Sequence, residues 1–167
     1  MWAILFGIPF LTFMVVLQTT IISRLPLLHG TADLILLIIL AWALVDRSDN
    51  AWIWSIVAGL MVGFVSALPF FVPIVVYLIM TGLTRLLQKF VWQTPILAMF
   101  LASFVGTFLI QGLTLLSLTF MGDTLPIRES LSLVTLPSAL LNILLAVPVY
   151  ALVREIAGWL SPIEMEK

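Results

Sequence analysis

The stretch 51–84, AWIWSIVAGLMVGFVSALPFFVPIVVYLIMTGLT, carries no charged residue over 34 consecutive positions. A helix needs roughly 20 apolar residues to cross the hydrocarbon core of a bilayer, so this run is too long for one span and long enough for two. Pro69 and Pro73 supply the break, because proline lacks an amide donor and disfavours helix in the residue before it. We therefore expect two membrane helices, over about 51–68 and 72–88.

The charged residues divide the rest of the chain by the same rule. Four more spans are predicted over about 2–22, 31–45, 94–121 and 133–153. Residues 123–132, which include Pro126, are expected to form a loop. The fold class predicted is an all-α polytopic membrane protein, with six transmembrane helices in a single domain over residues 1–167.

The composition excludes several classes of protein and of site. Charged residues make up 9% of the chain and hydrophobic residues 63%, whereas a soluble domain has about 25% charged residues. Such a chain is not a nucleic-acid binder with a basic patch or a disordered linker. It has no cysteine and a single histidine, His29, so we expect no metal and no cofactor. No paired acids on one helix face and no phosphate-binding loop are present, and an enzyme is not expected.

Lysine and arginine are distributed unequally between the two predicted sides. With six spans, the side that holds both termini carries five basic residues: Arg47, Arg85, Lys89, Arg154 and Lys167. The other side carries Arg24 and Arg128. Basic residues concentrate on the cytoplasmic side of membrane proteins, which predicts cytoplasmic N- and C-termini. The six tryptophans fall near the side with the termini, as expected of indole rings in the headgroup layer.

Four polar side chains fall within or at the edge of the predicted spans: Gln18, Asp33, Gln111 and Asn142. Polar groups at membrane depth are costly, and by default they indicate a functional site. We take the four as candidate cavity or partner contacts. For Asp33 an equally good interpretation is an N-cap, since a carboxylate at a helix start accepts bonds from free amides. Gln18 and Asn142 are also suited to hydrogen bonds between helices.

Small residues recur at intervals of four in three predicted spans. Such spacing lets helix backbones approach closely in lipid. The favoured interpretation is packing within the bundle, and the alternative is that the stripe on the first helix binds a partner's helix. The candidate packing residues are Ala3, Gly7, Gly59, Gly63, Ala67, Ala98, Ala102 and Gly106.

Three segments, in order and spacing, resemble the rod shape-determining protein MreD family. Leu17-Gln18-Thr19-Thr20 followed by Ala32-Asp33-Leu34-Ile35-Leu36-Leu37 is similar to the family's "LQSS…PDLLLL" opening, with Ala32 in place of a proline. Residues 58–63, AGLMVG, are similar to its glycine-rich third span, and residues 141–150, LNILLAVPVY, to its last helix. Many members have an aspartate shortly after those glycines, where this chain has Ser66-Ala67-Leu68-Pro69. We therefore do not expect this chain to have the function that this aspartate has in the family.

The resemblance implies a non-enzymatic component of the bacterial cell-elongation complex in the inner (cytoplasmic) membrane. MreD-like proteins bind MreC, and through it the class B penicillin-binding transpeptidase, RodA and MreB. The family fold is similar to that of the substrate-binding subunits of energy-coupling-factor transporters, six helices around an outward-facing cavity. Gln18, Asp33 and Asn142 are the residues expected near such a cavity.

An alternative function is the substrate-capture subunit of a vitamin transporter of that type. The sequence argues against this alternative, because the outer loops offer few polar groups to bind a vitamin. Tight recognition of a small polar ligand needs several polar groups that converge on it. The sequence leaves open whether the bundle forms a homodimer.

Overall fold

The structure, a computed structural model, describes residues 2–20, 30–45, 50–66, 69–90, 94–122 and 127–160. Nearly all of these residues are helical. The elements are α1 (Trp2–Thr20), α2 (Leu34–Val45), α3 (Asn50–Val65), α4 (Phe71–Phe90), α5 (Pro95–Met121), α6 (Ile127–Glu129), the π-helical segment η2 (Ser130–Thr135) and α7 (Leu136–Leu160). The last three form one continuous rod.

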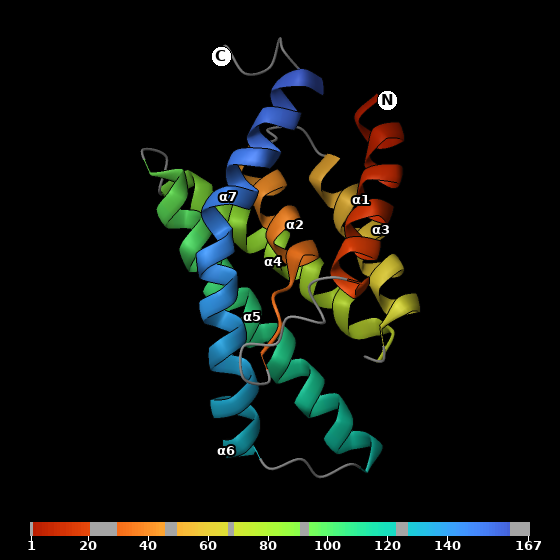
Figure 1. Cartoon of the computed structure of the whole chain (residues 1–167), viewed down its shortest axis with the longest axis vertical. Helices are drawn as coiled ribbons and strands as arrows, with labels where there is room; N and C mark the ends of the chain where they lie inside the picture. The colour runs from red at the N-terminus through yellow and green to blue at the C-terminus, as the bar shows by residue number, and fades with distance from the viewer. Residues whose placement is uncertain are drawn as a thin grey trace.

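The helices pass back and forth along one axis. Figure 1 shows α1, α3 and α5 running away from the end that holds both termini, and α2, α4 and α7 running back towards it. In the described residues, three helices are long and apolar enough to cross a membrane: Phe71–Phe90, Pro95–Met121 and Ser130–Trp159. Three more are apolar but shorter: Gly7–Thr20, Leu34–Val45 and Asn50–Val65.

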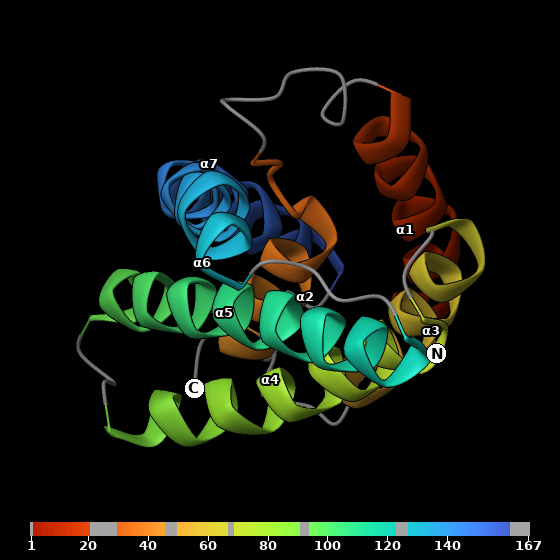
Figure 2. The same ribbon diagram turned by 90° about the horizontal axis from the view of Figure 1, so that it is seen from below.

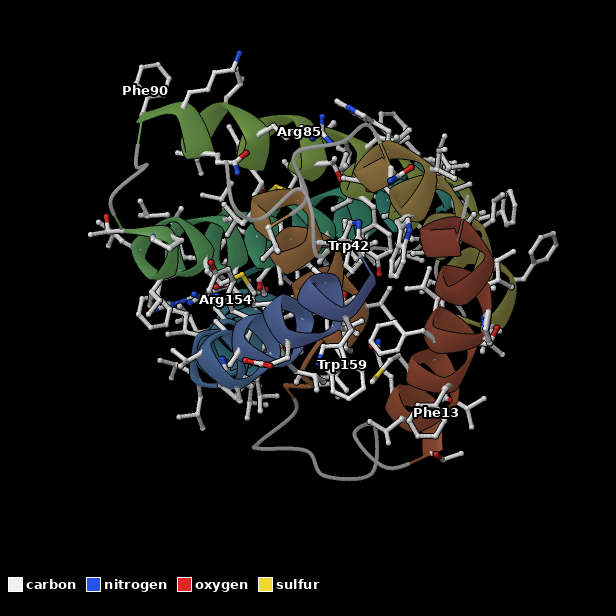
Figure 3. All side chains as sticks on the ribbon, turned by 90° about the horizontal axis from the view of Figure 1, so that it is seen from above. Phe13, Trp42, Arg85, Phe90, Arg154 and Trp159 are labelled. Atoms are coloured by element: carbon white, nitrogen blue, oxygen red, sulfur yellow. The ribbon has the colours of Figure 1, made fainter. Side chains whose placement is uncertain are left out.

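The outer surface of the bundle is apolar. Figure 3 shows Phe13 and Phe90 pointing outward from the rim, where they are 60% and 84% exposed. On α7, Leu140 and Leu144 are each 70% exposed. Contiguous apolar surface on this scale is unusual in a water-soluble monomer, and it suits a protein whose outer face meets lipid.

The centre of the bundle is α2. Figure 2 shows it enclosed by the other helices, and it contacts α1, α3, α4, α5 and α7. Eleven of its 12 residues are buried, from Leu34 to Leu44, because a helix that is apolar on every face has no side to present to water. Its length is about 18 Å at 1.5 Å per residue, well short of the roughly 30 Å of a bilayer core. One end of α2 therefore lies inside the bundle, while the carbonyl of Leu44 near the other end accepts a 2.8 Å hydrogen bond from Gln88 Nε2.

The predicted boundaries of two helices are wrong. The second helix starts at Leu34 and not near residue 31, because the Asp33 side chain accepts a bond from the Leu36 amide and thereby caps the helix. The last helical rod starts at Ile127 and not at residue 133, and it continues to Leu160 instead of ending at 153. Residues 127–132, predicted as loop, are therefore helical. The wide π-helical turn precedes Pro137, whose missing amide leaves the preceding turn without a normal helical bond.

Most of the small residues pack inside the bundle. A Cβ on Gly59 would lie 2.7 Å from the Ile74 Cα of α4, and one on Gly63 would lie 2.7 Å from the Phe70 carbonyl oxygen. A Cβ on Gly7 would lie 2.8 Å from the indole of Trp54. Ala98, Ala102 and Gly106 are buried. The Ala3 side chain and Ala67 lie outside what the structure describes.

Two of the tryptophans do not lie in a headgroup layer. Trp42 and Trp54 are 3% and 2% exposed, and their rings stack with centroids 4.0 Å apart and planes 9° from parallel. Figure 3 shows Trp42 among the helices at the centre of the bundle. The prediction that these indoles face the membrane surface is wrong, because they join α2 to α3. Trp159, at 88% exposed, remains free to meet headgroups.

Substituting Gly59 with Ala is expected to lower the free energy of unfolding by about 1–3 kcal/mol, because the new Cβ meets the backbone of α4 and forces the helices apart. Gly112→Ala is the matched control on α5. A Cβ there meets nothing within 4 Å, so the change should stabilise by about 0.5–1 kcal/mol through helix propensity alone. Thermal unfolding of both variants in detergent checks this. Equal effects of the two substitutions would contradict the close packing of α3 on α4.

Candidate functional site: a polar cavity where the central helix begins

A short non-helical segment, Gly30–Asp33, leads into α2 and lies along α7; we call it the strap. The Thr31 amide donates to Ser138 Oγ at 3.0 Å, and the Asp33 amide donates to Asn142 Oδ1 at 2.8 Å. Two residues of extended chain advance by about 6.6 Å and four residues of helix by about 6.0 Å. Because these two lengths are nearly equal, Ser138 and Asn142, one helical turn apart on α7, can accept hydrogen bonds from alternate amides of the strap.

Gly30 allows the strap to reach α7. A Cβ at this position would lie 2.6 Å from both the Pro137 Cβ and the Ser138 backbone nitrogen. Neither atom belongs to a flexible side chain that could move away. A residue without a side chain is therefore required where the strap crosses the start of α7.

The first amides of α2 are capped by side chains. Asp33 Oδ1 accepts from the Leu36 amide at 3.0 Å, and Gln18 Oε1 of α1 accepts from the Ile35 amide at 3.1 Å. A backbone group left without a partner inside a bilayer costs several kcal/mol, and a helix can begin there only if other groups satisfy it. Gln18 and Asp33 satisfy this requirement, and an acidic side chain suits the positive end of the helix dipole.

The Asp33 carboxyl has neighbours on two other helices. The Gln18 side chain hydrogen-bonds to it from α1. The Tyr77 hydroxyl of α4 is fully buried and interacts with it electrostatically. That hydroxyl lies outside hydrogen-bonding geometry with any residue the structure describes. The acid is thus held between α1, α2 and α4 without a basic partner among these contacts.

Asn142 connects three elements. It is 1% exposed, and while its oxygen accepts from the strap, its Nδ2 donates to Thr107 Oγ1 of α5 at 2.8 Å. Thr107 in turn donates to the Ser103 carbonyl of its own helix at 2.7 Å. This buried chain of bonds ties α7 to both the strap and α5, and each member depends on the next for a partner.

These groups surround a cavity of about 250 Å³. All four polar side chains singled out in the sequence, Gln18, Asp33, Gln111 and Asn142, line it. The remaining lining residues are Thr31, Ala32, Val62, Ser66, Thr107, Ile110, Thr114 and Ser138. Among the described residues, Asp33 is the only one with an ionisable side chain that lines the cavity. The site is therefore a largely neutral hydrogen-bonding cavity with one acid at the start of α2.

Sequence reasoning missed several polar residues of this site. Ser138 lies one helical turn before Asn142, and Thr107 lies one turn before Gln111, so each shares a helix face with a residue already singled out. That spacing is a usable signal. The sequence gives no comparable signal for Gly30, because nothing in it shows that the strap crosses α7.

Comparisons with known proteins add no assignment: no protein-family model, curated protein or solved structure matches this chain. Within the part of the chain that the structure describes, no group of three or more His, Cys, Asp or Glu residues is placed to hold a metal ion. His29, Arg24, Arg47 and Lys167 lie outside the described residues.

Proposed function

We propose that this chain is a non-enzymatic, multi-pass membrane scaffold of the MreD type. It would lie in the bacterial inner membrane with both termini in the cytoplasm. There it would bind MreC and, through MreC, regulate lateral peptidoglycan synthesis and cell shape.

One observation carries the proposal. The residues that resemble MreD at three distant places in the chain meet at a single site, where Gln18 and Asn142 hydrogen-bond to the backbone at Ile35 and Asp33. Chance similarity between apolar spans would give no reason for these particular polar residues to converge. Their convergence supports a shared architecture in which the motif residues hold a short central helix.

The charge distribution is consistent with this placement. Arg85 and Lys89 lie in the last half of α4, and Arg154 lies near the end of α7, so all three are towards the end with the termini (Figure 1). Arg128 lies on α6 at the opposite end. More basic residues on the termini side agree with a cytoplasmic location of that side.

The proposed mechanism is a rigid platform for a partner helix. The caps on α2 and the bonds of Asn142 fix the strap, α5 and α7 relative to one another. Apolar outer faces such as the leucines of α7 remain available in lipid. The single membrane helix of MreC would pack on the bundle, which would bias MreC between conformations that do or do not activate the transpeptidase.

The Asp33→Ala substitution is expected to abolish co-purification of MreC and to round the cells, because the first turn of α2 loses its cap. Asp33→Asn keeps an acceptor for the Leu36 amide and should retain both properties, since Asn caps helices as well as Asp does. Glu155→Ala, an exposed acid on α7, is the control. Normal MreC binding and cell shape with a folded Asp33→Ala variant would contradict the role of this site.

The same purification tests the alternative function. The cavity has the polar lining that a vitamin-capture subunit needs. Mass spectrometry of the protein in mild detergent should find a bitopic MreC-like partner. If a vitamin is found in stoichiometric amount and no protein partner is found, the scaffold function is wrong and the transporter-subunit function takes its place.

A further inference from the structure

We propose that the cavity, together with the apolar groove beside it, binds a neutral amphiphile: an uncharged hydroxyl-bearing headgroup in the cavity and its alkyl chain in the groove. The groove is a smaller space of about 40 Å³. It shares Gln18, Val62 and Ser66 with the cavity. The two spaces are therefore adjacent, with these three residues between them.

The groove is suited to an alkyl chain. The residues it adds are mainly apolar, with Val15 of α1, Ile35 of α2 and Val65 of α3 on its walls. Val65 is 58% exposed on the outer face of the bundle. An alkyl chain seated there would pass from the cavity to the surface that meets lipid, and so would not have to leave the bilayer.

The cavity is suited to a headgroup with hydroxyls. Gln111 is the strongest indication of a ligand. It lines the cavity, and its carboxamide has no hydrogen-bond partner among the described residues. Thr114 donates to the Ile110 carbonyl and keeps its lone pairs as acceptors. Ser138 accepts from the strap and keeps its own proton. Donors and acceptors are thus both present, as a hydroxyl group requires.

The headgroup is uncharged for an electrostatic reason. No Lys, Arg or His is among the described residues that line the cavity, so within this lining a phosphate would find no cationic partner and would lie next to Asp33. A cation would find a single acid among the described lining residues, Asp33, whose carboxyl already accepts hydrogen bonds from the Leu36 amide and the Gln18 side chain. The volume also exceeds by far the roughly 30 Å³ of a single water, and a glycerol-sized headgroup fits.

The test compares two lipids that differ by a phosphate: 1-monooleoylglycerol and 1-oleoyl-lysophosphatidic acid. The purified full-length protein is kept in an amine-oxide detergent, because maltoside headgroups are polyols and would compete. Native mass spectrometry and ligand-induced thermal stabilisation should both report binding of monooleoylglycerol. The phosphate analogue should bind at least tenfold more weakly. Equal or tighter binding of the phosphate analogue would overturn the proposal.

Variants assign the binding to this site. Gln111→Leu should weaken monooleoylglycerol binding about three- to tenfold, the usual effect of losing one or two neutral hydrogen bonds. Its unliganded melting should match the wild type, because Gln111 has no described partner to lose. Thr119→Val, on an exposed turn of the same helix, is the control and should bind normally. Unchanged affinity in Gln111→Leu would overturn the assignment.

Two further experiments distinguish a bound lipid from a bound free polyol. Val65→Trp should narrow the groove and weaken monooleoylglycerol binding several-fold, with little effect on folding at a position that is 58% exposed. Glycerol alone should not displace the lipid at equal concentration. Displacement by glycerol, together with normal binding by Val65→Trp, would show that the groove takes no part. These measurements use the protein without MreC, so their failure leaves the proposed scaffold function standing.

Discussion

Replacing Gly30 with Val is expected to lower the free energy of unfolding by about 3 kcal/mol, at the upper end of what overpacking causes. The added atoms would collide with Pro137 and with the Ser138 backbone nitrogen, each 2.6 Å from the first of them. The strap would have to move off α7, which would break the hydrogen bonds of the Thr31 and Asp33 amides. The measurement is thermal or denaturant-induced unfolding in detergent.

Thr31→Val is the matched control for the strap. It exchanges a hydroxyl for a methyl group at the next residue of the strap, and the bond to Ser138 uses the Thr31 backbone amide and survives the substitution. The exposed Thr31 side chain has no described hydrogen-bond partner of its own. Its effect should stay within about 0.5 kcal/mol. If Gly30→Val were as mild as this control, the strap would not contact α7 as described.

Replacing Asn142 with Leu is expected to lower the free energy of unfolding by about 2–4 kcal/mol, because two groups lose their partners at once. The Asp33 amide loses its acceptor, and the Thr107 hydroxyl loses its donor. Single bonds between membrane helices are worth only about 0.6 kcal/mol on average. The larger effect is expected here because a backbone amide outside any helix has no alternative partner in a bilayer.

A graded series tests that explanation. Thr107→Val removes the acceptor for Asn142 Nδ2 and the hydroxyl that donates to the Ser103 carbonyl, but it leaves the strap amide bonded, so it should lower the free energy of unfolding by about 1 kcal/mol. Leu144→Ala, on the outer side of α7 where Leu144 is 70% exposed, should have the smallest effect. Measuring the unfolding of all three variants under one condition ranks them by the free energy of unfolding that each substitution removes. An Asn142→Leu variant no less stable than Thr107→Val would show that the strap amide finds another partner.

Much of the helical architecture could be predicted from the sequence. The order of six apolar segments and the break between Val65 and Phe71 follow from where charges and prolines fall, because lipid tolerates neither free backbone groups nor unpaired charges. The four polar side chains of the cavity were also recognisable, since each stands out in an apolar span. That three of them lie near one cavity was expected from the resemblance alone. Composition and spacing could not predict it, because it depends on how helices separated by more than 100 residues pack.

The tertiary structure alone decided where α2 begins and what the polar residues do there. Asp33 starts the helix at Leu34 because Gln18 and Asn142 arrive from other helices to take up the neighbouring amides. The stacking of Trp42 on Trp54 likewise depends on how α2 meets α3. By itself the sequence determined which segments are helical and apolar, since those properties are local. The depth at which the central helix starts depends on non-local hydrogen bonds, which exist only once the bundle has formed.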